Sequence, residues 1–151
     1  MALLCQCVIA EAGTQHELID VATGLVLTKG SATSVRQFAL ANGHVIMETQ
    51  NVCKAPQPGM GWKLCHQGFD PADFSMSGGD DRAYMWKGKG LADVYALHYG
   101  EGILEVMVPK DLYRSRLQRH EQPYQGGPPI EVPVPHADFD VLNNSIRRWH
   151  T

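Results

Sequence analysis

The chain carries the stretch IEVPVP at residues 130–135, in which one carboxylate, Glu131, stands among strand-forming residues. The stretch ends in proline and leads into HADF at residues 136–139, where a helix is expected to begin. Alternation along a strand places Glu131 on the face opposite Ile130 and Val132. In a chain of this size that face is either a solvated surface or a cleft.

Two further segments precede this strand. The segment ILEVMVP at residues 103–109 predicts a second apolar strand. The segment FSMS at residues 74–77 places Ser75 and Ser77 after an aromatic residue. Serines before Gly78-Gly79 are also typical of a solvated turn, so a structural interpretation of this pair stays open.

An aromatic-Ser-x-Ser, then an apolar strand, then a Glu-Val-x-Val-Pro strand resembles the order found in the ADP-ribosyltransferase superfamily, in particular its small bacterial toxins and effectors. The resemblance covers the second half of the chain only. It implies an α+β fold, with a mixed, mostly antiparallel split sheet and short flanking helices. It also implies NAD as substrate.

The resemblance assigns roles to individual residues. Glu131 would hydrogen-bond the ribose of NAD and stabilise the cationic state that forms as nicotinamide leaves. Ser75 and Ser77 would support Glu131, and Tyr84 would stack on the nicotinamide. The alternatives are an exposed strand carboxylate for Glu131 and ordinary core packing for Tyr84 and its neighbour Trp86.

Members of the superfamily also grip NAD with an arginine or histidine on an early strand. His66 has suitable neighbours but lies close to Ser75, whereas His44 has better separation. Arg36 and His16 are weaker candidates. Any of these histidines can equally be a surface residue or a satisfied core residue.

The bulk composition predicts one soluble globular domain spanning residues 1–151, with a sub-boundary in the loop at 54–61. The net charge of −3 argues against a general nucleic-acid coat or a basic membrane binder. No run approaches the ~18 apolar residues of a membrane span, and the start reads as a strand rather than a signal peptide. We therefore expect a cytoplasmic protein without a membrane partner, or one delivered into a target-cell cytoplasm by a specialised secretion route.

The four cysteines, Cys5, Cys7, Cys53 and Cys65, are too few for a disulfide scaffold. Cys5 and Cys7 fall on one face of a strand, which suits core packing. A zinc site from Cys53, Cys65 and His66 lacks a supporting CxxC pair. We predict reduced, buried cysteines and no metal.

Predicted strands and helices alternate irregularly along the chain. The sequence has no GxGxxG and no Gly-rich loop ending in Gly-Lys-Ser/Thr, so a Rossmann or P-loop nucleotide site is not expected. Strands are expected at 3–10, 18–21, 25–27, 44–49, 62–65, 103–108 and 130–134. Helices are expected at 31–41, 91–99, 111–120 and 138–149, with a short helix through Tyr84 and Trp86.

The leading hypothesis is a bacterial ADP-ribosyltransferase toxin or effector that modifies a protein or nucleic-acid acceptor and is paired with a cognate immunity protein. A second is a metal-independent ribonuclease toxin with His120 or His136 as acid and base and Arg116 or Arg119 on the phosphate. A third is a non-catalytic interaction or immunity module, which needs none of these polar residues.

Overall fold

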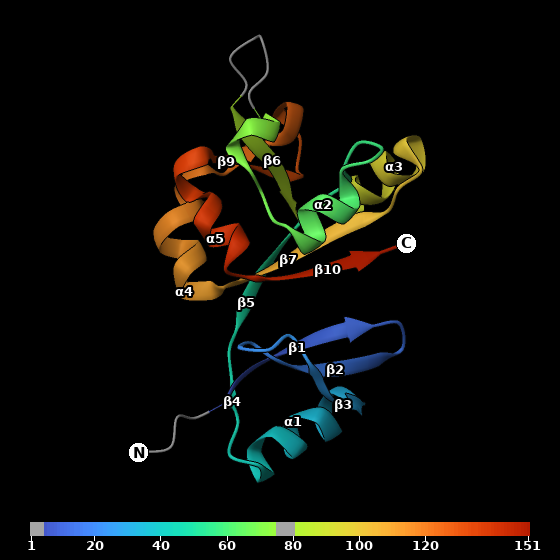
Figure 1. Ribbon diagram of the computed structural model, residues 1–151, viewed down its shortest axis with the longest axis vertical. Coiled ribbons are helices and arrows are strands. Elements are labelled where there is room, and N and C mark those ends of the chain that lie inside the picture. The colour runs from blue at the N-terminus through green and yellow to red at the C-terminus, as the bar shows by residue number, and fades with distance from the viewer. Residues whose placement is uncertain (1–4, 75–80) are drawn as a thin grey trace. The chain divides into compact units, whose positions relative to one another are not determined.

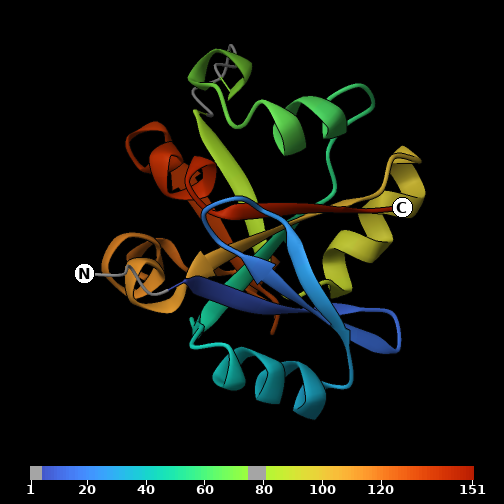
Figure 2. The same ribbon diagram turned by 60° about the horizontal axis from the view of Figure 1, so that its bottom comes forward.

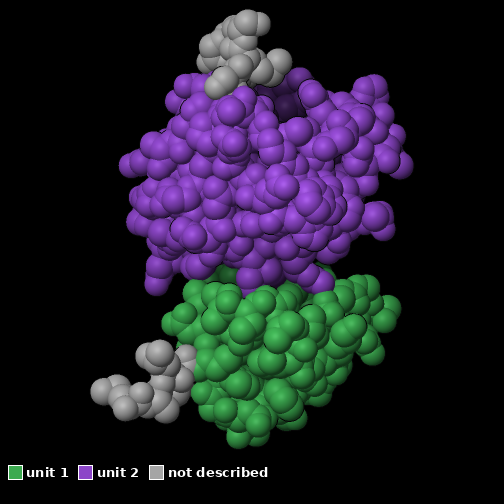
Figure 3. Space-filling view, in the orientation of Figure 1, with its two compact units in different colours: residues 1–49 green, residues 50–151 purple. Residues whose placement is uncertain are grey.

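The computed structural model describes residues 5–74 and 81–151. The chain forms two compact units, Met1–Thr49 and Gln50–Thr151 (Figure 3). The division falls ahead of the loop at 54–61. Each unit contains one open, mostly antiparallel sheet; the N-terminal unit adds one helix and the C-terminal unit several short ones, which confirms the α+β class. Among the described residues, no helix has the length and apolar character needed to cross a membrane.

The N-terminal unit is a four-stranded sheet with one helix (Figure 1). Its strand order is β3-β2-β1-β4, with β1 antiparallel to β2, β2 antiparallel to β3, and β4 parallel to β1. The elements are β1 (Gln6–Ala12), β2 (Gln15–Asp20), β3 (Val26–Gly30), α1 (Ala32–Ala41) and β4 (Val45–Ile46).

Helix α1 begins and ends where the sequence predicted. The Ser31 side chain caps it by accepting a hydrogen bond of 3.1 Å from the backbone N–H of Ser34. Val35 and Ala39, four residues apart, are its buried residues and face the sheet. Gly43 then adopts φ +72°, which favours glycine, and turns the chain back into β4.

The C-terminal unit is built on a six-stranded sheet with the order β10-β7-β5-β6-β9-β8. Figures 1 and 2 show its helices arranged around this sheet. The pairs β10–β7, β5–β6, β6–β9 and β8–β9 are antiparallel. The strands are β5 (Thr49–Lys54), β6 (Arg82–Lys87), β7 (Ile103–Pro109), β8 (Gln122–Pro123), β9 (Ile130–Pro135) and β10 (Ile146–His150). The α-helices are α2 (Gly61–His66), α3 (Gly90–Tyr99), α4 (Lys110–Leu112) and α5 (Phe139–Asn143).

Apolar side chains cover both faces of this sheet. On one face, Val132 and Val134 of β9 join Met85 of β6 and residues of β7, α2 and α5 in the main core. On the other face, Trp86 of β6 packs with a smaller cluster that includes Ala92 of α3. Strands β7 and β9 lie where the apolar runs predicted them. The helical run 110–120 and helix α3 also match the prediction.

Two predicted elements have the wrong type. The expected strand at 62–65 is helix α2, in which Leu64 is buried and Trp62 is exposed. The expected helix through Tyr84 and Trp86 is strand β6. Because β6 lies between two other strands and carries apolar residues on both faces, Met85 on one and Trp86 on the other, its sequence shows no polar alternation to mark it as a strand.

The predicted helix at 138–149 is also wrong. Helix α5 ends at Asn143, and the chain continues as strand β10, which pairs with β7. The Asn143 side chain bonds both backbone groups of Phe69 instead of lying along a longer helix: its Oδ1 accepts from Phe69 N at 2.6 Å and its Nδ2 donates to Phe69 O at 3.0 Å. Asparagine favours such local backbone partners over a helix interior.

Candidate active site

A pocket of about 400 Å³ opens in the C-terminal unit where β5 and β6 separate. The two strands pair at Val52–Lys87 and at Cys53–Trp86. Beyond these pairs, Lys54 and the residues after it line the pocket from the β5 side, while β6 lines it from the other. Its β6 lining residues are Arg82, Tyr84 and Trp86, which alternation places on one face of the sheet.

Aromatic rings make up much of the pocket wall. Trp86 and Tyr95 stack with centroids 5.2 Å apart, and Tyr124 meets Trp86 edge-on at 6.0 Å. The hydroxyls of Tyr95 and Tyr124 lie 2.5 Å apart. This hydrogen bond, with burial and the nearby Glu131 carboxylate, raises the pKa of Tyr124. The wall is therefore a set of neutral, mutually supported rings suited to a flat ligand.

Charged groups line the same pocket. Lys54 Nζ donates to the backbone oxygen of Tyr84 at 3.4 Å and stands 5.9 Å from the centre of the Phe74 ring. Arg82 contributes a second cation. The carboxylate in the lining is Asp73, which forms an ion pair of 2.6 Å with Lys63. The pocket thus combines an apolar aromatic wall with two cations, a pattern that fits an aromatic ligand carrying negative charge.

Glu131 lies on β9, directly opposite Trp86 of β6. Residues that face each other across antiparallel strands project from the same side of the sheet, so Glu131 shares the pocket side with Trp86 and Tyr84. It is 9 % exposed and accepts a hydrogen bond of 2.8 Å from Gln122 Nε2. It does not itself line the pocket, but it lies close enough for its charge to act on Tyr124, which does.

The structure brings together two of the predicted site residues, Glu131 and Tyr84. Ser75 and Ser77 lie outside the described residues. His66 ends helix α2, where it is exposed and its ring lies 5.0 Å from that of Trp62. It does not line the pocket. His44 belongs to the N-terminal unit.

Several pocket residues escaped sequence analysis. Lys54 and Arg82 stand in segments that gave no motif. Tyr95 was expected only as part of a helix, and Tyr124 only as part of a loop. They meet only because β5, β6, α3 and the turn at 124–126 come together in the fold. No spacing along the chain could have revealed them.

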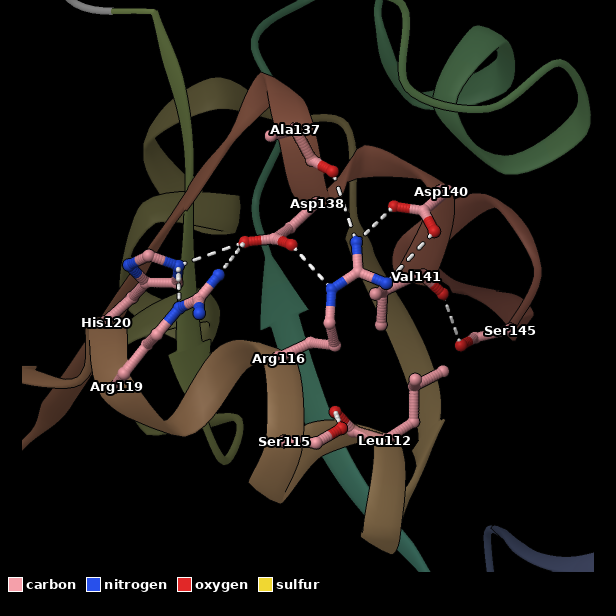
Figure 4. A network of polar contacts seen from close by, with 10 residues as sticks. All are labelled: Leu112, Ser115, Arg116, Arg119, His120, Ala137, Asp138, Asp140, Val141 and Ser145. Carbon is pink, nitrogen blue, oxygen red and sulfur yellow. Dashed lines mark hydrogen bonds and ion pairs between the residues drawn. The ribbon is translucent and has the colours of Figure 1, made fainter.

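Three basic residues of the ribonuclease hypothesis, Arg116, Arg119 and His120, form a separate network around Asp138 (Figure 4). The fourth, His136, lies outside this network, with its ring 5.1 Å from that of Phe139. Asp138 is 2 % exposed and accepts hydrogen bonds from Arg116 Nε at 2.8 Å and from His120 Nε2 at 3.0 Å. Arg119 Nη2 donates to Asp138 Oδ2 at 3.5 Å. Arg116 also donates through Nη2 to Asp140 Oδ1 at 2.8 Å. The two arginines are held by carboxylates, which leaves less of their charge for a substrate phosphate.

Burial acts to raise the pKa of Asp138, but the hydrogen bonds from Arg116 and His120 outweigh it, so the pKa is lowered. Asp138 therefore remains an anion that ties the 110–120 helical run to the start of α5. The arrangement is that of a structural anchor.

Comparisons of the chain with models of protein families, with curated proteins and with solved structures found no match.

Proposed function

We propose that the C-terminal unit is a NAD-dependent ADP-ribosyltransferase of the bacterial toxin or effector type, acting on a protein or nucleic-acid acceptor. The observation that carries the proposal is the position of Glu131. It lies opposite Trp86, on the side of the sheet that lines the aromatic pocket with Tyr84 and Arg82. The opening between β5 and β6 supports the finer assignment of a split, ADP-ribosyltransferase-like sheet.

The pocket chemistry suits NAD. Nicotinamide in NAD is a flat cationic ring, and cationic rings bind well on the faces of tryptophan and tyrosine. Tyr84 and Trp86 offer such faces in the pocket. The diphosphate of NAD carries negative charge, for which Lys54 and Arg82 are suitable partners. In this proposal these two cations hold NAD, in the role first given to His66 or His44.

The reaction breaks the bond between the ribose C1′ and the nicotinamide nitrogen. The bonding electron pair leaves with nicotinamide and neutralises its ring, while positive charge develops on the ribose. Glu131 stabilises that charge from a fixed position, since its carboxylate is buried and held by Gln122. An acceptor hydroxyl or amine then bonds C1′ and releases a proton. With water as acceptor, the same site is a NAD glycohydrolase.

The test is release of nicotinamide from labelled NAD, in the presence and absence of a cell lysate. We expect Glu131→Ala to lower the release rate at least about 100-fold, since fixed transition-state charges contribute effects of that order. Glu105→Gln is the matched control. Glu105 is a 7 % exposed strand carboxylate of the same sheet, hydrogen-bonded to Asn51 and His150 and not part of the pocket lining. Its variant should keep the native rate.

Absence of release from the native chain, with every lysate tried, would overturn the proposal and favour an interaction or immunity module. Equal losses in the Glu131 and Glu105 variants would do the same, because they would reflect damage to the sheet. RNA cleavage that depends on His120 and Arg116 would instead favour the ribonuclease hypothesis.

A further inference from the structure

We infer that the N-terminal unit binds a Zn²⁺ ion through Cys5, Cys7 and His44. The two thiol sulfurs and a ring nitrogen of His44 all lie within 4.8 Å of one another. This inference concerns a unit that the proposed transferase chemistry does not use. It also departs from the sequence expectation, which considered zinc only among Cys53, Cys65 and His66.

The backbone fixes the three residues on one side of the sheet. Cys5 directly precedes β1 and Cys7 lies within it, and the two side chains pack in the same cluster on one face of the sheet. Strand β4 runs parallel to β1 with Ile46 beside Cys7, and the backbone N–H of Val45 donates to the oxygen of Cys5 at 2.8 Å. His44 directly precedes β4, and its ring nitrogen lies within 4.8 Å of both sulfurs, on the same side of the sheet.

The distance between the two sulfurs matches that of two thiolates bound to one metal ion. The Sγ atoms of Cys5 and Cys7 lie 3.7 Å apart. Two thiolates on one tetrahedral zinc, each at about 2.3 Å, are separated by about 3.8 Å. A disulfide would require about 2.0 Å. The fold thus holds the two sulfurs at zinc spacing without any further movement of the strand.

The third donor is an imidazole whose hydrogen bonding is incomplete. His44 Nδ1 is buried and has no hydrogen-bond partner among the described residues. The Phe38 ring stacks on His44 with centroids 6.3 Å apart, which restricts its orientation. A buried nitrogen without a partner costs stability, and coordination of the imidazole by a metal ion gives this side chain a defined partner.

The donor set and the size of the unit both favour zinc. Two thiolates and one imidazole suit Zn²⁺, which leaves a fourth position for water or another donor. The fully buried cluster of this unit is small: Cys7, Leu18, Val35 and Ala39. Domains of so few residues often need a metal or disulfides to supplement their core. Zinc binding here would contribute directly to folding of the unit.

The experiment uses the full chain, reduced and freed of metal, titrated with Co²⁺ and then with Zn²⁺. We expect one equivalent of Co²⁺ to produce thiolate-to-cobalt charge-transfer bands, and Zn²⁺ to displace it. Cys5→Ser and His44→Asn should each weaken zinc binding at least about 100-fold, the upper range found for residues that merely support a ligand. Both positions are only partly buried, so these variants should fold, which circular dichroism can check.

Cys65→Ser is the matched control, because it removes a partly buried thiol of the other unit and should leave the bands unchanged. Three results would each overturn the inference. The reduced chain could give no charge-transfer bands, or the bands could survive in both the Cys5 and His44 variants. Dissolved oxygen could also oxidise the two thiols to a stable Cys5–Cys7 disulfide in the isolated protein, and the chain could bind no metal after that disulfide is reduced. None of these outcomes bears on nicotinamide release.

Discussion

Asp138 illustrates at the scale of single residues how one buried charge controls its neighbours. Its carboxylate accepts hydrogen bonds from Arg116 and His120 and has 2 % of its surface exposed. Removing the charge would leave Arg116 with only the exposed Asp140 as an anionic partner. The energetic consequence should therefore depend on pH, since the pKa of Asp138 is lowered from its ordinary value of 3.8.

We expect Asp138→Asn to lower the free energy of unfolding by about 2 kcal/mol at pH 7, because it breaks a buried charge pair. A carboxyl whose pKa is lower in the folded state stabilises the protein above its unfolded pKa and loses that contribution as pH falls through the folded pKa. The gap between native and variant should thus persist at neutral pH and close progressively below about pH 4.

Urea unfolding followed at several pH values measures this gap. Asp140→Asn is the control, because Asp140 is 55 % exposed and its ion pair with Arg116 should contribute less than about 1 kcal/mol. A gap between native chain and Asp138→Asn that stays constant down to pH 2 would contradict the assignment.

Sequence reasoning found some of the site's residues and missed others, for a physical reason. Glu131 could be singled out because a carboxylate within an apolar strand needs an explanation. Tyr84 could be singled out because it follows the Ser-x-Ser segment, in an order of motifs that resembles the ADP-ribosyltransferase superfamily. Lys54 and Arg82 carry no such local signal. Their placement in one pocket depends on β5 and β6 separating beyond two residue pairs, which is a property of the fold.

At the scale of elements, the sequence predicts those whose local pattern agrees with their surroundings. Helix α1 has a serine cap, a buried i, i+4 pair and a glycine stop, and the structure confirms it. Strand β6 was mistaken for helix, because a strand with apolar residues on both faces and a helix share the same apolar spacing over short runs. Strand β10, a half-buried edge strand, was included in the predicted helix because its apolar residues Ile146 and Trp149 continue the helical spacing of Phe139 and Leu142. The helix predicted at 138–149 ends at Asn143 in the structure, where the Asn143 side chain forms hydrogen bonds with the backbone of Phe69.

Asn143 therefore provides a test at this scale. We expect Asn143→Ala to lower the free energy of unfolding of the C-terminal unit by about 1–3 kcal/mol, since two hydrogen bonds to the Phe69 backbone are lost. Asn143→Asp keeps an acceptor for Phe69 N but loses the donor to Phe69 O, so its loss should be intermediate. Chemical denaturation gives both values.

Asn144→Ala is the control for this prediction. Asn144 is exposed at the end of α5, and its side chain makes no hydrogen bond among the described contacts, so the change should stay within about 0.5 kcal/mol. Equal effects of the Asn143 and Asn144 variants would show that helix length, and not the Phe69 contact, sets the stability of this region.

At the scale of the whole molecule, the two units contain separate buried clusters. Leu18 lies in the cluster of the N-terminal unit, and Leu104 in the main core of the C-terminal unit. Both side chains are fully buried. Composition alone suggested one domain of ordinary size, because length and average hydrophobicity do not report how apolar residues divide between cores.

Because each unit has its own cluster, we expect thermal or urea unfolding to proceed in two transitions that can be perturbed separately. Leu18→Ala should destabilise the N-terminal unit and Leu104→Ala the C-terminal unit, each by about 2–5 kcal/mol. Each variant should shift one transition and leave the other in place, as additivity predicts for sites without shared partners.

Tryptophan fluorescence reports on one unit alone, since Trp62, Trp86 and Trp149 all belong to the C-terminal unit. Circular dichroism follows both units. A single transition moved equally by both substitutions would mean that the two clusters unfold as one cooperative core. If the N-terminal unit binds zinc, added Zn²⁺ should raise the midpoint of the transition that Leu18→Ala shifts, because a ligand stabilises the unit that binds it. The midpoint of the transition followed by tryptophan fluorescence should stay unchanged.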